Sequence, residues 1–112
     1  MEEIWQRYPC RSDQTTWQEI GDEVIILDVD SGAYYGLEGP GARFWTLADG
    51  TLTAQAIAER IADEYEVSLD QARGDVSELV ADLMENRLLV CADSPLPHAT
   101  GAGPAQRPPP SA

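Results

Sequence analysis

The stretch TTWQEIGDEVIILDVDSGAYYGLEGPG, residues 15–41, decides the fold that the sequence predicts. It alternates runs of β-branched and aromatic residues with short turn segments, a pattern typical of consecutive antiparallel strands. Three strands are expected, at residues 15–20, 23–29 and 33–37. Residues 30–32 form the turn between the last two, where Gly32 can adopt the positive φ that such a hairpin commonly needs.

In the third predicted strand, side chains alternate between two faces, because a strand has a period of two residues. Ala33, Tyr35 and Leu37 share one face, while Tyr34 and Gly36 share the other. We expect Tyr35 and Leu37 to face the core. Gly36 weakens a strand and often marks the close approach of another backbone or a ligand, although a bend before the next helix explains it equally well.

Three helices are predicted after the strands. Pro40 suits a first helical position and Gly50 suits the left-handed position after a helix end, so the first helix is expected at residues 40–49. The second helix, at residues 54–65, has one wholly apolar face and Thr53 as its N-cap. The third begins at Ser68, which has the spacing of a capping box with Gln71, and runs to about residue 86.

Together these elements predict an α+β fold of the winged helix-turn-helix type, in which a three-stranded antiparallel sheet is followed by three helices. One domain at residues 15–90 accounts for all of them. Residues 1–14 form an N-terminal extension whose place is left open, since Ile4, Trp5 and Tyr8 are apolar but their neighbours resemble a loop. Residues 91–112 are rich in proline, glycine and alanine, and we expect them to be a disordered tail.

The net charge of the chain argues against two classes of partner. Twenty Asp and Glu residues against seven Lys and Arg residues leave a formal charge of −13. Such a surplus repels phosphate backbones and anionic lipids, so neither nucleic acid nor a membrane is an expected partner. It would favour a cationic peptide, although solubility alone explains it as well.

Residues that could carry catalysis or bind a metal are scarce. His98 is the one histidine and falls in the predicted tail, and neither Cys10 nor Cys91 has a second ligand at metal-binding spacing. The sequence therefore predicts no enzyme, no metal and no cofactor. The first ten residues lack a signal-peptide-like apolar run and no window is long enough to span a bilayer, so a cytoplasmic location is expected.

A winged-helix arrangement with the wrong charge for DNA is expected to recognise something else. If the third strand lies at the sheet edge, its unpaired N–H and C=O groups can accept an extended peptide as a fourth strand. On the third helix, Asp75, Glu78 and Asp82 flank an apolar stripe and could border a groove. A solvated helix face explains the same acids without a ligand.

The segment DVDSGAYYGLEGPGARFW at residues 28–45, then ADGT and DVSELVADLMENRLL, resembles the PqqD-like family of peptide-recognition proteins, also called RiPP recognition elements. The resemblance covers about residues 15–90. The pattern G-x-Y-Y-x-L followed by G-A-R-x-W looks most like the stand-alone members that serve lasso-peptide biosynthesis. Family members commonly have asparagine where this chain has Glu38, whose carboxylate could still accept N–H groups at the start of the first helix.

The resemblance implies that the leader of a ribosomally made precursor peptide adds antiparallel to the third strand and lies against the third helix. Apolar pockets would hold a leader tyrosine and proline spaced as Tyr-x-x-Pro, and Asp75 and Asp82 would meet leader lysines. The implied leader-binding residues are Ala33, Tyr34, Tyr35, Gly36, Leu37, Asp75, Val76, Leu79, Asp82 and Leu83.

The resemblance also implies two protein partners. A separate cysteine protease would remove the leader, and an ATP-dependent macrolactam synthetase would close the ring, while this chain would perform neither step. Two alternatives stay open at the level of sequence: an acidic winged-helix transcriptional regulator, and a protein-interaction module with a different partner.

Overall fold

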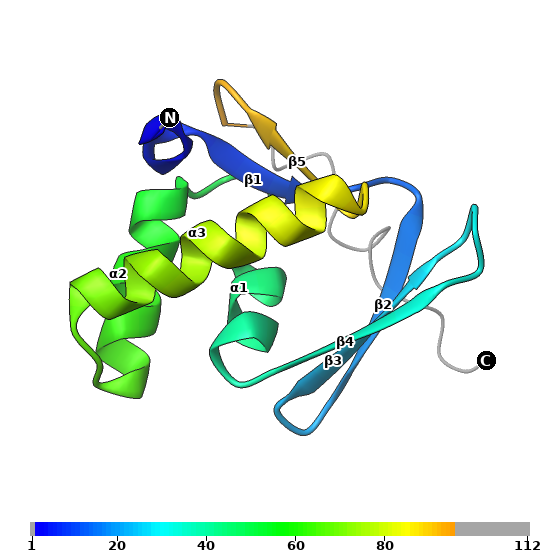
Figure 1. Ribbon diagram of the computed structural model, residues 1–112, viewed down its shortest axis with the longest axis horizontal. Coiled ribbons are helices and arrows are strands. Elements are labelled where there is room, and N and C mark those ends of the chain that lie inside the picture. The colour runs from blue at the N-terminus through cyan, green and yellow to red at the C-terminus, as the bar shows by residue number, and fades with distance from the viewer. Residues whose placement is uncertain (1, 96–112) are drawn as a thin grey trace.

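A computed structural model describes residues 2–95 of the chain, without the side chains of residues 2 and 3. The predicted tail therefore lies outside the described residues from position 96 onward. Figure 1 shows the elements in chain order: η1 (Glu2–Gln6), β1 (Tyr8–Arg11), β2 (Thr15–Ile20), β3 (Glu23–Asp28), β4 (Tyr34–Glu38), α1 (Pro40–Leu47), α2 (Ala54–Tyr65), α3 (Leu69–Glu85) and β5 (Leu89–Ala92). Within the described residues, no helix has the length and apolar character needed to cross a bilayer.

The predicted three-stranded antiparallel sheet followed by three helices is confirmed. The strands lie in the order β2-β3-β4, and their bounds differ from the predicted ones by at most one residue. β4 begins at Tyr34 because Ala33 still belongs to the hairpin turn, where its carbonyl accepts the N–H of Asp28 at 2.9 Å. Gly32 has the expected positive φ, 81°.

The helices begin where the sequence predicts. The hydroxyls of Thr53 and Ser68 accept the N–H groups of Ala56 and Gln71, as expected for N-caps. α1 ends at Leu47, earlier than the predicted residue 49, and the chain then turns toward β1. No side chain caps the start of α1, where the N-cap position belongs to residue 39, so the Glu38 carboxylate does not have the capping role considered for it.

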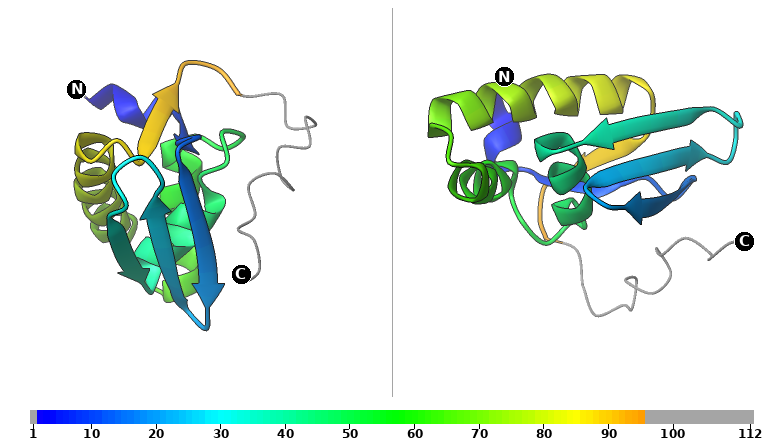
Figure 2. Two further views of the ribbon diagram at one scale, coloured as in Figure 1. Left: turned by 90° about the vertical axis from the view of Figure 1, so that its right-hand side faces the viewer. Right: turned by 90° about the horizontal axis from the view of Figure 1, so that it is seen from below.

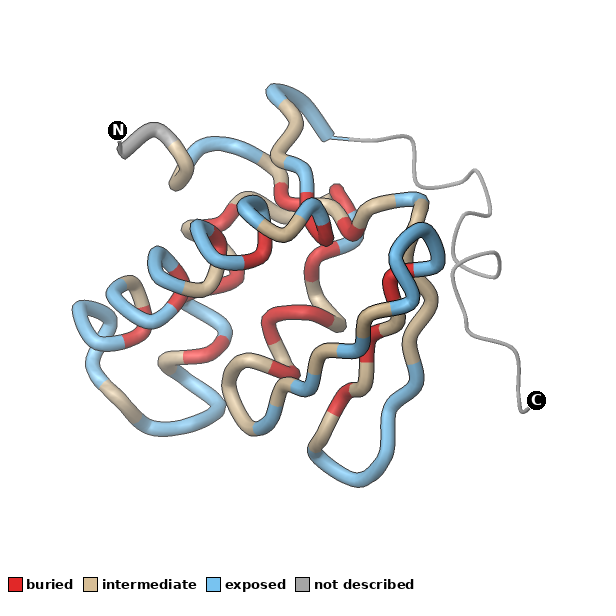
Figure 3. The backbone as a smooth tube through the Cα atoms, turned by 45° about the vertical axis from the view of Figure 1, so that its right-hand side comes forward, coloured by how far each residue is buried: buried red, intermediate tan, exposed pale blue. Residues whose placement is uncertain are grey.

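The core forms around α1, which contacts β3, β4, α2 and α3. Phe44 and Trp45 on this helix are fully buried, and the ring of Trp17 from β2 meets Trp45 edge-on, with 6.4 Å between centroids. Buried residues of the sheet and of all three helices face one another across this centre (Figure 3). The helices therefore cover one face of the β2-β3-β4 sheet.

Residues 4–14, which sequence patterns left unplaced, are part of the folded body. β1 pairs antiparallel with β5 from the other end of the described chain. Pro9 fits within β1 because the N–H of Ser12 donates to the carbonyl of Leu88, the residue before β5, so strand alternation turns the Pro9 nitrogen away from β5. The Pro9 carbonyl accepts the N–H of Gly50 instead, at 2.9 Å.

Arg11 connects β1 to α1 and β2. The residue is 9% exposed, and its Nη1 donates to the carbonyls of Trp45 at 2.6 Å and Thr46 at 3.1 Å, near the C-terminal end of α1. A cation is favourable at this end of a helix. The guanidinium also lies over the ring of Trp17, 5.0 Å from its centroid. One side chain thus joins three elements.

Asp28 organises the β3–β4 hairpin. Its Oδ1 accepts the backbone N–H of Asp30 at 3.0 Å and the side-chain amide of Gln14 at 3.3 Å. Burial raises the pKa of this carboxyl, but hydrogen bonds from Asp30, Ser31 and Gln14 to the ionised form outweigh it and hold the pKa below its ordinary value. The ionised carboxylate therefore stabilises the turn that begins β4.

We expect Arg11→Ala to lower the free energy of unfolding by about 2 kcal/mol, because hydrogen bonds to two helix-end carbonyls and the contact with Trp17 are lost together. Urea denaturation followed by tryptophan fluorescence measures this change. Arg60→Ala, at an exposed position of α2, is the control and should stay within about 0.5 kcal/mol of the parent. An equal effect of the two substitutions would contradict the role of Arg11.

Asp28→Asn should lower the melting temperature at pH 7 and lose this effect in acid. Because the folded-state pKa is depressed, the carboxylate stabilises the fold above the unfolded-state pKa of about 3.9, and this contribution disappears as pH falls through the lower folded-state value. Melting curves of parent and variant at pH 7 and pH 2.5 test the prediction. A gap of the same size at both pH values would refute it, and Asp63→Asn at an exposed site should show no gap.

Candidate peptide-binding edge and groove

β4 forms one edge of its sheet, since β3 is its sole strand neighbour among the described residues. Two hydrogen bonds show which backbone groups face β3. The carbonyl of Ala33 accepts the N–H of Asp28, and the N–H of Gly39 donates to the carbonyl of Asp22. Both hydrogen bonds involve odd-numbered residues, Ala33 and Gly39. In an antiparallel pair, successive residues of a strand direct their backbone groups alternately toward the partner strand and away from it. Odd-numbered residues therefore pair with β3.

The alternation leaves a defined set of backbone groups at the open edge. The N–H and C=O groups of Tyr34, Gly36 and Glu38 point away from β3, toward the side on which α3 lies. Both views of Figure 2 show β4 as the strand of this sheet nearest to α3. Tyr35 and Leu37 turn their side chains to the core, as predicted, and pack against it. The edge can thus accept a further strand without disturbing the existing sheet.

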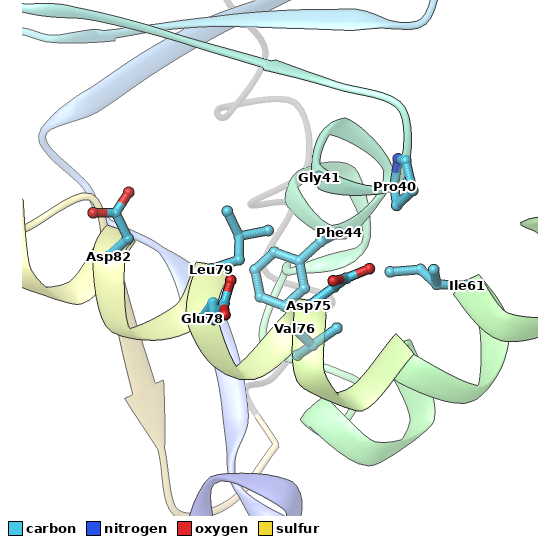
Figure 4. A pocket seen from close by; sticks show the side chains of 9 residues that line it. All are labelled: Pro40, Gly41, Phe44, Ile61, Asp75, Val76, Glu78, Leu79 and Asp82. Carbon is cyan, nitrogen blue, oxygen red and sulfur yellow. The ribbon is translucent and has the colours of Figure 1, made fainter. Parts of the chain in front are cut away.

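A hollow of about 520 Å³ lies between α1 and α3, beside the end of β4. A Cβ added at Gly41 would lie 3.8 Å from atoms of Leu37 and Leu79, so the side chains of β4 and α3 both approach this glycine. Figure 4 shows Phe44 of α1 in the hollow, with Val76 of α3 close to it. The full lining is Pro40, Gly41, Phe44, Ile61, Asp75, Val76, Glu78, Leu79 and Asp82.

Three carboxylates border this hollow on α3. Asp75, Glu78 and Asp82 follow one another at spacings of three and four residues, which places them along one side of the helix. All three are exposed, and none forms an ion pair with another described residue. The hollow therefore combines an apolar interior with a negatively charged margin that the described part of the chain leaves uncompensated.

A second hollow, of about 390 Å³, lies where the C-terminal end of α3 approaches the β3–β4 hairpin. Tyr35 of β4 lines it, so it adjoins the same strand as the first hollow. Its walls are otherwise polar: Gln14, Asp28, Asp30, Ser31, Glu85, Asn86 and Arg87. Extended chain beside β4 would pass from an apolar hollow to a polar one.

Five of the ten predicted site residues line the two hollows, and Tyr34 and Leu83 are among the five that do not. Asp75, Val76, Leu79 and Asp82 line the first hollow and Tyr35 lines the second. Tyr34 is 69% exposed, with its side chain on the face of the sheet away from the core, and Leu83 is 3% exposed within the core. Strand alternation turns Tyr34 away from the helices. Leu83 is on the same side of α3 as Val76, but it is buried in the core and lines neither hollow.

Five residues that line the first hollow were absent from the predicted site. Pro40 and Gly41 come directly after β4, and Glu78 lies on the same helix side as Asp75, so proximity in sequence could have indicated them. Nothing in the sequence near Phe44 or Ile61 indicates a binding site, since each has the pattern of an ordinary core residue of its helix. Their place in the wall depends on how α1 and α2 pack against α3.

The two cysteines are poor nucleophiles. Burial raises the pKa of both the Cys10 and the Cys91 thiol, and the nearby arginines, Arg11 and Arg7, counter it incompletely. In the β1–β5 register Cys10 lies opposite Val90 and Cys91 opposite Pro9, so the two thiols point to opposite faces and are not bonded. Neither adjoins the groove beside β4.

Comparisons with known proteins identify one matching family model and two similar solved structures. The family model described as coenzyme PQQ synthesis protein D matches residues 23–89, more than half of the chain. The solved structure of TbiB1 in complex with the TbiA(beta) leader peptide has a TM-score of 0.67 and 30% identity, covering 71% of this chain and 93% of its own. Lasso peptide synthetase B1 complexed with the leader peptide has a TM-score of 0.64 and 26% identity, covering 74% and 98%. No curated protein sequence matches the chain.

Proposed function

The chain belongs to the coenzyme PQQ synthesis protein D family, and on this premise we propose that it binds the leader segment of a ribosomally synthesised precursor peptide. The observation that carries the proposal is the open edge of β4 beside an apolar hollow with an uncompensated acidic margin. The matched proteins were solved with leader peptides bound. Family members of this kind are binding partners and not catalysts, and the chain is not an enzyme.

The leader adds to β4 as an antiparallel fourth strand of the sheet. Its backbone pairs with the N–H and C=O groups of Tyr34, Gly36 and Glu38, which face the open edge, and not with every residue from 33 to 37. Backbone pairing supplies affinity that depends little on leader sequence, while the side chains that enter the groove supply selectivity.

Side chains of a paired strand share a face with the residues directly opposite. Leader residues opposite Leu37 and Tyr35 therefore face α3 and the two hollows, and they are separated by one residue. In the antiparallel direction the first hollow receives the earlier part of the leader. It takes an apolar side chain, such as the tyrosine or proline that the family resemblance implies, and the later part runs toward the second hollow.

The acidic margin selects leaders that carry basic residues beside the apolar one. Asp75 and Asp82 are separated by about 10 Å along α3, given a rise of about 1.5 Å per helical residue. An extended peptide covers that distance in about three residues. Lysine or arginine side chains flanking the apolar contact can thus reach both carboxylates.

The captured precursor is presented to two separate enzymes of lasso-peptide biosynthesis in the cytoplasm, a cysteine leader peptidase and an ATP-dependent macrolactam synthetase. The contribution of this chain is effective concentration: it holds the core peptide close to enzymes that would otherwise bind it weakly. Burial raises the pKa of both of its thiols, and they have no role in this function.

Gly36→Pro should weaken leader binding by about tenfold or more, because proline removes an N–H that faces the open edge and leaves a leader carbonyl unpaired. The fold should survive, since this N–H makes no bond within the sheet and proline is tolerated on such edges. Fluorescence polarisation with a labelled synthetic leader measures affinity, and circular dichroism checks the fold.

Gly36→Ala is the matched control. It keeps the N–H, and its Cβ would meet a single neighbour, Cδ1 of Ile25, at 3.9 Å, which is ordinary contact. Its affinity for the leader should stay within about threefold of the parent, well under the tenfold step of 1.4 kcal/mol. Equal affinities of a well-folded Gly36→Pro variant and Gly36→Ala would refute pairing at this edge.

Replacing both Asp75 and Asp82 with asparagine should weaken a lysine-containing leader by about threefold to tenfold at low salt, because two opposing charges are removed from the margin. The difference should shrink at high ionic strength, where exposed charges are screened. Titrations at 20 mM and 500 mM NaCl check both statements. Asp63→Asn on α2 serves as the control, and an undiminished salt dependence in the double variant would contradict the role of the margin.

A further inference from the structure

The face of the β2-β3-β4 sheet turned away from the helices carries apolar side chains that the core does not use. β3 alternates between buried and half-buried residues, and its half-buried set includes Ile25 and Leu27. Neither belongs to the core cluster or to the partly buried residues packed on it. In the left view of Figure 2 the three strands lie in front of the helices, and no described element covers them.

Neighbouring strands extend this apolar surface, which we term the outer face. Leu27 lies opposite Tyr34 of β4, which is 69% exposed, and Ile20 near the end of β2 is 55% exposed. Ile25 lies opposite Gly36, which has no side chain to cover it. An alanine would fit there without strain, so packing within the chain does not require this glycine. Ile25 is thereby left open to contact from outside.

One end of the outer face carries two acids in direct opposition. Glu23 of β3 pairs in register with Glu38 of β4, and the row continues to Ile20 of β2. Like charges directly opposite across strands destabilise a sheet. Neither carboxylate forms an ion pair with another described residue. The arrangement costs the isolated fold stability and would be relieved by a cation supplied from outside.

We propose that the outer face is a docking surface for a protein partner with an apolar contact patch bordered by lysine or arginine. Charge complementarity identifies the partner's chemistry: apolar residues Ile20, Ile25 and Leu27 beside the Glu23–Glu38 pair, on a chain of net charge −13. The surface lies on the opposite side of the sheet from the groove beside α3, so both can be occupied together. The partner is an enzyme that processes the bound precursor, and this part of the inference rests on the proposed function.

The test separates docking from leader binding. The double variant Ile25→Thr/Leu27→Thr has β-branched side chains at both positions, which suit a strand, but it removes apolar area from the outer face. Direct binding of the purified leader peptidase and of the purified macrolactam synthetase to the full chain is measured by biolayer interferometry, with and without synthetic leader. Leader affinity is measured separately by fluorescence polarisation.

We expect the double variant to lose at least about tenfold in affinity for one of the two enzymes while its leader affinity stays within about threefold of the parent. Glu23→Lys should weaken the same enzyme and also raise the melting temperature, because it converts a like-charge pair into an opposite-charge pair. A role confined to stability cannot produce changes in opposite directions. Val90→Thr, at a 53% exposed position of β5, is the matched control and should alter neither affinity.

Three outcomes would overturn the docking surface: unchanged affinity for both enzymes, a parallel loss of leader affinity, or a parent chain that is a dimer in sedimentation and becomes a monomer in the double variant. The last would assign the outer face to a second copy of the chain. If the parent chain did not bind leader, the result would count against the proposed function. The docking surface would still be tested, because enzyme binding to the chain is also measured without leader.

Discussion

The pleat of β4 is the constraint on which the rest of the structure depends. A strand can direct its backbone groups to two sides, and β3 occupies one of them through the odd-numbered residues. The same alternation turns Tyr35 and Leu37 to the core and leaves the N–H and C=O groups of Tyr34, Gly36 and Glu38 without a strand partner among residues 2–95. A single geometric rule therefore anchors the strand, opens its edge and decides which leader residues can face α3.

The distribution of arginines explains how the groove keeps its negative charge. Arg11 donates to backbone carbonyls at the end of α1, Arg43 donates two hydrogen bonds to Glu64, and Arg73 lies over the ring of Trp5. Each of these arginines joins two elements of the fold, and none forms an ion pair with Asp75, Glu78 or Asp82. Basic residues are few in this chain, and these three are used internally. The carboxylates on α3 and on the outer face are consequently available to basic groups of other molecules.

Much of this arrangement could be predicted from local patterns. The hairpin turn at Gly32, the caps at Thr53 and Ser68, and the core-facing side of β4 all follow from preferences that act over a few residues. The β1–β5 pair could not be predicted, because its strands are separated by nearly the whole folded chain and each is four residues long. Such short strands carry little periodicity, and their pairing depends on where the helices between them leave the two ends.

Sequence by itself determined the composition of the binding region: a strand with Gly36 at its centre, an amphipathic helix with acids along one side, and too few basic residues to neutralise them. Tertiary structure decided which of those residues form the wall. It placed Phe44 and Ile61 beside the hollow and buried Leu83 in the core. The physical reason is that periodicity specifies which side of an element is apolar, whereas the element that packs on that side is chosen by contacts between segments distant in sequence.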